Sequence, residues 1–377
     1  MKKRIPFNKT FITGKESGYI SRSVKKGEIE GGGVFARKCE KWLENVLKTK
    51  KAYLTNSCTA GMEMAALLMG VKRSHEILMP SFTFTSTANA FLLRGAVPVF
   101  IDIREDTLNI NEDKIEERIS EKTKAICPVH YAGIGCEMEK ILKIARKNHL
   151  LIVEDAAHAA MARYKKKYLG TIGDIGVYSF HNTKNISSGE GGAILINNLE
   201  YIERAEVIRE KGTNRNKFLR GEVDKYEWVD IGSSFLVSEI IAAYLYAQLE
   251  KGDMITKKRV DCWNNYYHGL KNLGKKGDLT LPSVPAGCRH NGHIFYLLTE
   301  NRKIRDALKD HLSKKGIQAV FHYVPLHLSP MGKSLGYREG QLKTTESISK
   351  RMLRLPLYPS LSKSDQQYII KAVKGFF

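Results

Sequence analysis

A lysine and an acidic residue of this chain each follow a short apolar segment. Lys184 lies four residues beyond the apolar run 175–180, and Asp155 lies two residues beyond the run 150–153. Short apolar runs of this kind predict buried β-strands, which would place both side chains at strand ends. A lysine amine can form a Schiff base with an aldehyde, and a carboxylate can keep a pyridine nitrogen protonated. The pair therefore predicts an enzyme that uses pyridoxal 5'-phosphate (PLP), with Lys184 as the Schiff-base lysine.

Each of these residues also has a simpler interpretation when taken alone. A single lysine is usually a solvated surface residue. Glu154 precedes Asp155 and could take its place as the partner of the pyridine. His158 could lie under the cofactor or bond to its phenolic oxygen, or it could be an ordinary core histidine. The prediction rests on the combination of residues.

Small and hydroxyl-bearing residues precede a predicted helix at 59–69. The segment 56–61 reads Asn-Ser-Cys-Thr-Ala-Gly. Small residues allow close approach, and a helix N-terminus offers free amides and partial positive charge to a phosphate. Plain N-capping by Ser57 or Thr59 is the alternative. The hydroxyl of Ser179 is a further candidate ligand for the phosphate, and an aromatic ring in 80–86 could stack on the pyridine, although such rings more often lie in the core.

Strand and helix patterns alternate along the first two thirds of the chain. Strands are predicted at 76–79, 97–101, 124–129, 150–153, 175–180 and 193–196, and helices at 40–47, 59–69, 91–93, 137–149, 238–249 and 256–270. This alternation predicts an α/β fold, with helices on both faces of a mostly parallel central sheet. The later part, with strands at 295–299 and 317–323 and helices at 303–315 and 364–377, predicts a smaller α+β unit.

A chain of 377 residues is long for one compact core, which favours two structural units. We place the boundary near residue 250, with a large PLP-binding domain and N-terminal segment at 1–250 and a small domain at 251–377. The absence of a low-complexity linker predicts that the two pack closely.

Composition narrows the classes of function. The net charge is +21, but the basic residues are spread along the chain, so we expect no nucleic-acid partner; a basic surface suits an anionic small substrate. No apolar run is long enough for a membrane span, and the N-terminus lacks the apolar region of a signal peptide. The six scattered cysteines favour reduced thiols over a disulfide framework or a metal site, so we expect a cytoplasmic protein.

The chain resembles the DegT/DnrJ/StrS family of PLP-dependent nucleotide-sugar aminotransferases nearly end to end. The resemblance is carried by NSCTAGMEMA (56–65), MPSFTFTSTANAF (79–91), VPVFIDI (97–103), PVHYAG (128–133), VEDAAHA (153–159), FHNTKNISSGEGG (180–192) and LPLYP (355–359). It implies a fold of PLP type I, like that of aspartate aminotransferase, and a homodimer with active sites at the subunit interface. It further implies Lys184 as the Schiff-base lysine, Asp155 at the pyridinium nitrogen, Phe84 stacked on the ring, His158 near the phenolic oxygen, and Thr59, Ala60 and Ser179 around the phosphate.

Segments 210–235 and 321–327 are similar to those of family members that make dTDP-4-amino-4,6-dideoxygalactose. This likeness implies transfer of an amino group from L-glutamate to the C4 keto group of a nucleotide-linked 4-keto-6-deoxyhexose, specifically dTDP-4-keto-6-deoxyglucose. The product would serve surface polysaccharide synthesis, such as that of lipopolysaccharide. Tyr323, His327 and Arg215 are candidate substrate contacts; Tyr323 and His327 could instead be residues of the small-domain core or surface.

The chain departs from the family at two places. Many members carry Gly-aromatic-Asn-aromatic-Arg, with the Asn reaching the phosphate in the neighbouring subunit; here residues 232–236 read Gly-Ser-Ser-Phe-Leu. Ser234 could take the part of that Asn, and Arg215 or Arg220 could supply the missing positive charge. His158 stands where the most similar subgroup usually has Gln.

Three alternatives stay open at this point. The enzyme could act at C3 or on another nucleotide sugar, or be a lyase. It could also be a non-catalytic regulator or nucleic-acid binder on the same fold. Some family members are dehydratases in which a histidine replaces the lysine, so a lysine at 184 favours transamination.

Overall fold

The centre of the molecule is a seven-stranded sheet. The computed structural model describes residues 4–377. The strand order is β1-β9-β8-β5-β4-β2-β3. The four pairings from β8 to β3 are parallel, whereas β9 runs antiparallel to both β1 and β8. The predicted, mostly parallel sheet is confirmed. The strands are β1 (Lys51–Thr55), β2 (Glu76–Pro80), β3 (Val97–Ile101), β4 (Thr123–Ile126), β5 (Leu151–Asp155), β8 (Ile175–Ser179) and β9 (Gly192–Ile196).

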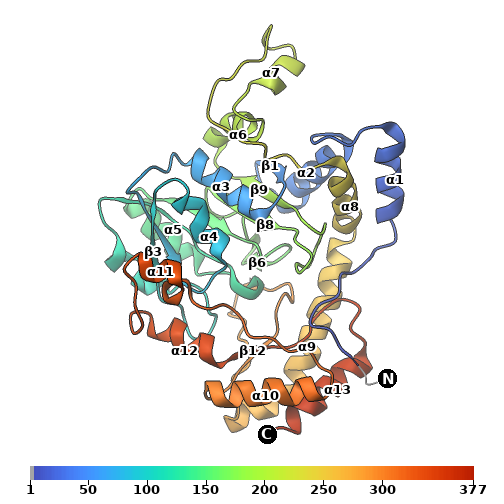
Figure 1. The fold of residues 1–377 in the computed structure, drawn as a ribbon, viewed down its shortest axis with the longest axis vertical. Helices are drawn as coiled ribbons and strands as arrows, with labels where there is room; N and C mark the ends of the chain where they lie inside the picture. The colour runs from blue at the N-terminus through green and yellow to red at the C-terminus, as the bar shows by residue number, and fades with distance from the viewer. Residues whose placement is uncertain (1–3) are drawn as a thin grey trace.

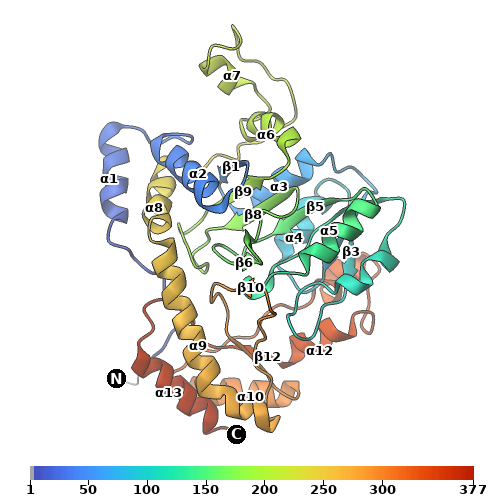
Figure 2. The same cartoon turned by 180° about the vertical axis from the view of Figure 1, so that it is seen from behind.

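Helices cover both faces of this sheet (Figures 1 and 2). Side chains of successive strand residues point to opposite faces, so an apolar strand supplies two cores at once. Leu54 and Leu78 pack into the core on one face, and Tyr53 and Ile77 pack into the core on the other. The first face is covered by α2 (Val34–Leu47), α5 (Met138–Lys147) and α8 (Glu239–Leu249). The second is covered by α3 (Cys58–Leu68), α4 (Thr85–Leu92) and α6 (Ile202–Arg209).

The later part of the chain builds a second core. The long helix α9 (Gly252–Lys276) runs from beside the sheet to the lower end of the molecule in Figure 1. There it packs with α10 (Arg302–Lys314), α13 (Lys363–Lys374), and the pair of β11 (Tyr296–Leu298) and β12 (Met352–Arg354). Ile5 joins this core from the other end of the chain through a parallel bridge to Ile317. The boundary at residue 250 stays a prediction.

One region differs from the sequence-based expectations, and for a second, residues 210–235, the sequence predicted no helix or strand. The predicted strand at 317–323 is replaced by an irregular segment with single bridges at Ile317 and Val320, and it ends at Tyr323, whose φ of 38° lies outside the extended region. Residues 210–235 leave the body of the protein as a long excursion that contains α7 (Arg215–Leu219) and projects at the top of Figure 1.

The remaining elements are short or peripheral. They are α1 (Glu16–Lys26), α11 (Pro330–Ser334), α12 (Lys343–Arg351), β6 (Arg163–Tyr164), β7 (Lys167–Tyr168), β10 (Cys288–Arg289), and 3-10 turns at 112–114, 116–118, 131–133, 199–201 and 326–328. Within residues 4–377, the structure contains no helix of the length and apolar character that a membrane crossing requires.

Candidate active site

The end of β5 carries two neighbouring carboxylates that face opposite sides of the sheet. Glu154 is fully buried and accepts bonds from the amides of Gly170, Ile172 and Gly173 and from His130, all at 2.7–2.8 Å. Those four bonds fill its acceptor positions, so Glu154 is a structural anchor for the loop before β8. The sequence alone left Glu154 open as the pyridine partner, and its orientation away from the cavity removes it from that role.

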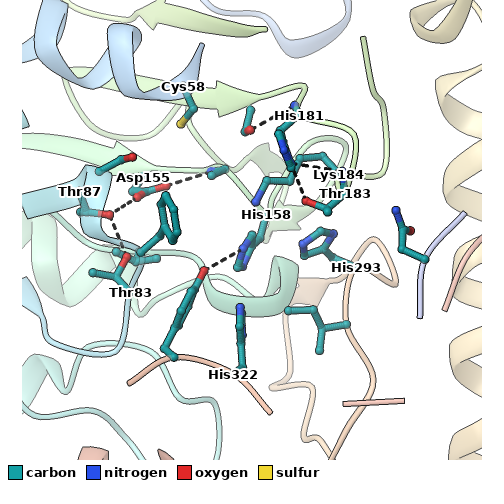
Figure 3. Close-up of a pocket in the computed structure, with 18 of the residues that line it drawn as sticks. Cys58, Thr83, Thr87, Asp155, His158, His181, Thr183, Lys184, His293 and His322 are labelled. Atoms are coloured by element: carbon teal, nitrogen blue, oxygen red, sulfur yellow. Dashed lines mark hydrogen bonds between the residues drawn. The ribbon is translucent and has the colours of Figure 1, made fainter. Parts of the chain in front are cut away.

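Asp155 lies on the other face and points into a cavity. Its Oδ2 accepts the hydroxyl of Thr87 at 2.7 Å, and its Oδ1 accepts the amide of Ala157 at 3.1 Å (Figure 3). Thr87 is itself linked to Thr83 at 2.8 Å. A carboxylate has about four acceptor positions, so these two bonds fix its orientation and still leave room for a donor in the cavity.

Lys184 reaches the same cavity from the loop after β8. Its main chain is fixed because its amide donates to the carbonyl of His181 at 2.9 Å, and the next residue, Asn185, is buried and bonded to His293 at 2.8 Å. Burial lowers the pKa of the Lys184 amine, and the nearby Arg354 lowers it further, whereas Cys58 and Asp155 oppose the shift. A buried amine with a lowered pKa is a typical nucleophile and proton-transfer group.

The N-terminus of α3 forms a third wall. Ser57 caps the helix by accepting the amide of Ala60 at 3.0 Å, and Thr59 bonds to Ser86 at 2.7 Å. The N-cap interpretation is confirmed for Ser57, and the phosphate site at the start of α3 stays a prediction. A side chain at Gly192 would place its Cβ 2.5 Å from the amide nitrogen of Cys58, so glycine is needed there for β9 to approach the helix start.

These walls enclose a cavity of about 670 Å³, within the range of small-molecule sites. The structure brings together there seven of the residues predicted from the sequence: Thr59, Phe84, Asp155, His158, Ser179, Lys184 and Tyr323. Figure 3 shows Asp155 and Lys184 entering the cavity from opposite sides of His158. The ring of Phe84 is largely exposed at the cavity, and its stacking on a cofactor ring stays a prediction.

His158 is the centre of a cluster of aromatic side chains. Its Nδ1 accepts the amide of Ala132 at 3.3 Å, which leaves the proton on Nε2, 3.4 Å from the hydroxyl of Tyr323. Burial lowers the pKa of His158 well below its usual range, and burial raises that of Tyr323, so both side chains are neutral. His293 lies 4.4 Å from His158 between ring centres.

Four predicted residues lie outside the cavity lining. Ala60 is buried behind the α3 cap and contributes only its bonded amide. The imidazole of His327 is fully buried between Ser81, at 2.7 Å, and Glu346, at 3.1 Å, and so does not reach the cavity. Arg215 lies on α7 beside Glu210, and Ser234 is exposed at the base of the same excursion, where its carbonyl accepts a bond from Asn56 at 3.4 Å; neither side chain lines the cavity.

Several cavity residues were missed by the sequence-based prediction. Thr87 orients Asp155, and Cys58, His293, His322 and Arg354 line the walls. His322 bonds to Tyr131 at 2.6 Å and stacks on Tyr323 at 3.6 Å between ring centres. For Arg354 a signal existed, namely a cation inside the apolar run 352–357. Within residues 4–377, the structure contains no cluster of three or more His, Cys, Asp or Glu placed to hold a metal ion.

The donor set fits PLP at its phosphate, its ring nitrogen and its aldehyde. The α3 N-terminus with Thr59 and Ser179 suits the phosphate, Asp155 suits a protonated ring nitrogen, and Lys184 suits the aldehyde. The pairing of a buried amine with a carboxylate that keeps open acceptor positions is the observation on which this fit depends.

Comparison with known proteins supports the same assignment. The chain is 32% identical to the spore coat polysaccharide biosynthesis protein SpsC of Bacillus subtilis, over 98% of this chain and 96% of that protein. It is 30% identical to GDP-perosamine synthase of Escherichia coli O157:H7, over 100% and 99%. The fold matches the putative sugar aminotransferase Spr1654 of Streptococcus pneumoniae in its PMP form, with a TM-score of 0.92, 25% identity and coverage of 99% and 98%; that protein is also known in a PLP form.

The family assignment follows from a match along almost the whole chain. Residues 11–374 match the DegT/DnrJ/EryC1/StrS aminotransferase family. The predicted aminotransferase class and the predicted α/β fold are thereby confirmed. The chain belongs to the DegT/DnrJ/EryC1/StrS aminotransferase family.

Proposed function

We propose that this protein is a PLP-dependent aminotransferase that moves the amino group of L-glutamate to the C4 keto group of a nucleotide-linked 4-keto-6-deoxyhexose. The carrier is dTDP, and the product is dTDP-4-amino-4,6-dideoxygalactose for surface polysaccharide synthesis. Lys184 and Asp155 in one cavity carry the proposal. Relatives named for perosamine synthesis and for spore coat polysaccharide support the substrate class.

The residues of the cavity have separate roles in the proposed reaction. PLP, when bound, supplies an electron sink that stabilises negative charge on the carbon attached to the amino group. Asp155, oriented by Thr87, stabilises positive charge on the ring nitrogen. Lys184 holds an amine whose lowered pKa suits it to take a proton at Nζ from the donor carbon and to return it at a neighbouring carbon.

Neutral groups around the reacting centre complete the arrangement. His158 carries its proton on Nε2 and can donate it to an oxygen in the cavity without adding a positive charge. The aromatic side chains of Phe82, Tyr131 and Tyr323 pack against one another beside it and exclude water from this wall.

We further propose a cytoplasmic homodimer in which each subunit completes the other's active site. The excursion at 210–235 exposes Tyr226, Trp228, Val229 and Ile231, and Trp228 is 81% exposed. A projecting apolar surface of this kind is typical of an interface. Ser234 lies at its base, where it can reach a partner subunit's phosphate site.

The oligomer is tested by light scattering of the wild type and of Trp228→Asp. A dimeric wild type and a monomeric, less active variant are expected. A monomeric wild type with full activity contradicts the shared site.

The reaction itself is tested with purified protein, PLP, L-glutamate and dTDP-4-keto-6-deoxyglucose. NMR of the product should show a 4-amino-4,6-dideoxyhexose of galacto configuration, and an amine at C3 or no turnover with this sugar would refute the substrate assignment. Lys184→Ala should lose turnover and the visible absorbance of bound PLP. Lys167→Ala, which removes an exposed lysine on β7, should keep both.

A further inference from the structure

The active-site cavity contains a guanidinium group with no carboxylate partner. Arg354 ends β12 and lines the cavity. Within residues 4–377 it forms no ion pair, and its Nε is buried without an acceptor. The one side-chain hydrogen bond of Arg354 runs from Nη2 to the carbonyl of Phe321, at 3.2 Å. An arginine has five N–H donors, so most of those on Arg354 are open to a ligand.

Other arginines within residues 4–377 differ from Arg354 in their hydrogen-bond partners or in their position. Arg209 and Arg351 also have a buried Nε without an acceptor, but each forms an ion pair with a carboxylate, and Arg305 forms one through its Nε. Arg94 also has a buried Nε without an acceptor, but this residue does not line the cavity. Arg259 does line it, and its Nε and Nη2 donate to the carbonyls of Gly292 and His293.

The guanidinium of Arg354 is also held in place. Its backbone pairs with Val320, at 2.7 and 3.1 Å, and its guanidinium carbon lies 4.7 Å from the ring centre of Phe7. Burial lowers the pKa of Arg354, which reflects a charged group removed from water with no opposing carboxylate. Such a group is costly to bury and gains most from an anionic ligand.

We infer that Arg354 binds the α-carboxylate of the amino donor. This inference rests on the proposed aminotransferase function and adds a substrate contact to it. A planar guanidinium can bind a carboxylate through two parallel hydrogen bonds. The phosphate of PLP has its own site at the α3 N-terminus, so Arg354 provides a second, separate anion site in the cavity.

Proximity to the reacting centre favours a carboxylate over the diphosphate of the sugar nucleotide. Arg354 lines the same cavity as Lys184 and His158, and its Nη2 bonds to the carbonyl of Phe321, two residues before the Tyr323 whose hydroxyl lies 3.4 Å from His158. In an amino acid the α-carboxylate is bonded to the carbon that loses its proton. In the sugar nucleotide the hexose ring separates the C4 keto group from the diphosphate, so a group beside Lys184 meets the carboxylate first.

The test measures the half-reaction in which the donor bleaches the visible absorbance of bound PLP. Arg354→Gln should raise the L-glutamate concentration for half-maximal rate by about 30-fold, as expected for the loss of a charge-assisted pair. Arg354→Lys should fall between this variant and the wild type. Arg302→Gln, which removes an exposed guanidinium on α10, is the matched control and should change nothing.

Two altered donors separate a direct contact from a structural effect. L-Isoglutamine replaces the α-carboxylate by an amide, and L-glutamine replaces the side-chain carboxylate. The wild type should prefer L-glutamate over L-isoglutamine strongly, and Arg354→Gln should remove most of that preference. The ratio between L-glutamate and L-glutamine should change by less than about threefold, because the lost contact is to the α-carboxylate.

Three outcomes overturn the inference. The first is an unchanged dependence of the rate on L-glutamate concentration in Arg354→Gln. The second is an undiminished preference for L-glutamate over L-isoglutamine in Arg354→Gln and Arg354→Lys. The third is a selective loss of affinity for the sugar nucleotide in these variants. The last would assign Arg354 to the diphosphate. Failure of the wild type to aminate dTDP-4-keto-6-deoxyglucose would refute only the proposed acceptor, because the donor half-reaction is measured without it.

Discussion

At the end of β5, two adjacent carboxylates face opposite sides of the sheet and differ in how many of their acceptor positions are used. Glu154 has four hydrogen bonds and no open acceptor position, whereas Asp155 has two and faces a cavity. The first carboxylate stabilises the loop that leads into β8, and the second is held ready for a ligand. Both are buried carboxylates, so their different roles depend on which hydrogen-bonding capacity the fold leaves unused.

The same contrast separates His327 from His158, and Arg259 from Arg354. His327 is fixed between Ser81 and Glu346, and Arg259 donates to two carbonyls. His158 lines the cavity with only a long bond of 3.4 Å from its Nε2 to the Tyr323 hydroxyl, and Arg354 lines it with donors that have no acceptor. Changes to the saturated groups should therefore affect stability, and changes to the open groups should affect catalysis.

The largest effect is expected at Asp155. Asp155→Asn keeps the shape of the side chain and removes the charge that stabilises a protonated ring nitrogen, so the rate of amino transfer should fall at least about a hundredfold. The unfolding midpoint should stay close to that of the wild type. Stopped-flow kinetics and thermal unfolding measure the two, and a fully active variant would show that the contrast with Glu154 is irrelevant to function.

Glu154→Gln should show the reverse pattern. The amide NH₂ would face backbone donors, so at least one buried donor loses its acceptor, and the free energy of unfolding should fall by about 2–4 kcal/mol. Urea denaturation measures this loss. The remaining folded protein should keep its kcat, and an inactive variant with unchanged stability would contradict the structural role.

A smaller effect is expected from the residue that orients Asp155. Thr87→Val keeps the volume but removes the hydroxyl that donates to Oδ2, so activity should decrease by up to about tenfold. Thr83→Val, which removes the next hydroxyl in the chain of bonds, should have a weaker effect. Equal losses in both variants would indicate general disruption of the α4 start, not loss of a specific bond.

The mildest prediction concerns the stability of the protein without PLP. Because the pKa of Lys184 is lowered from 10.5 in the folded state, the unfolded chain binds more protons between the two pKa values, and stability rises with pH in that window. Lys184→Met should therefore be more stable than the wild type at neutral pH. The difference should shrink as pH approaches 10.5, and a difference that stays constant with pH would show that Lys184 is not buried as a charge-sensitive group.

The sequence predicted the helices and strands that carry the site better than it predicted the segment 317–328, which forms another part of the cavity wall. Periodic apolar runs locate β5, β8 and α3, and strand alternation then decides between Glu154 and Asp155 once the sheet is known. The segment 317–328 could not be predicted in this way. Tyr323 has a positive φ and lines the cavity, whereas His327, four residues later, is fully buried in the protein.

Residues from distant parts of the chain were the hardest to predict. Arg354 is 170 positions from Lys184, and Thr87 is 68 positions from Asp155, so no local spacing joins them. Their roles depend on how the small core packs against the sheet, which the pattern of one strand or helix does not contain.

Identification of the lysine that binds the cofactor is the most direct test of this account. Holoenzyme would be reduced with sodium borohydride, which fixes the cofactor to the lysine that holds it, and its peptides would then be mapped by mass spectrometry. We expect the added mass on the peptide that contains Lys184, and no labelled peptide in Lys184→Ala. Attachment at another lysine, with Lys184 unmodified in active enzyme, would contradict the account.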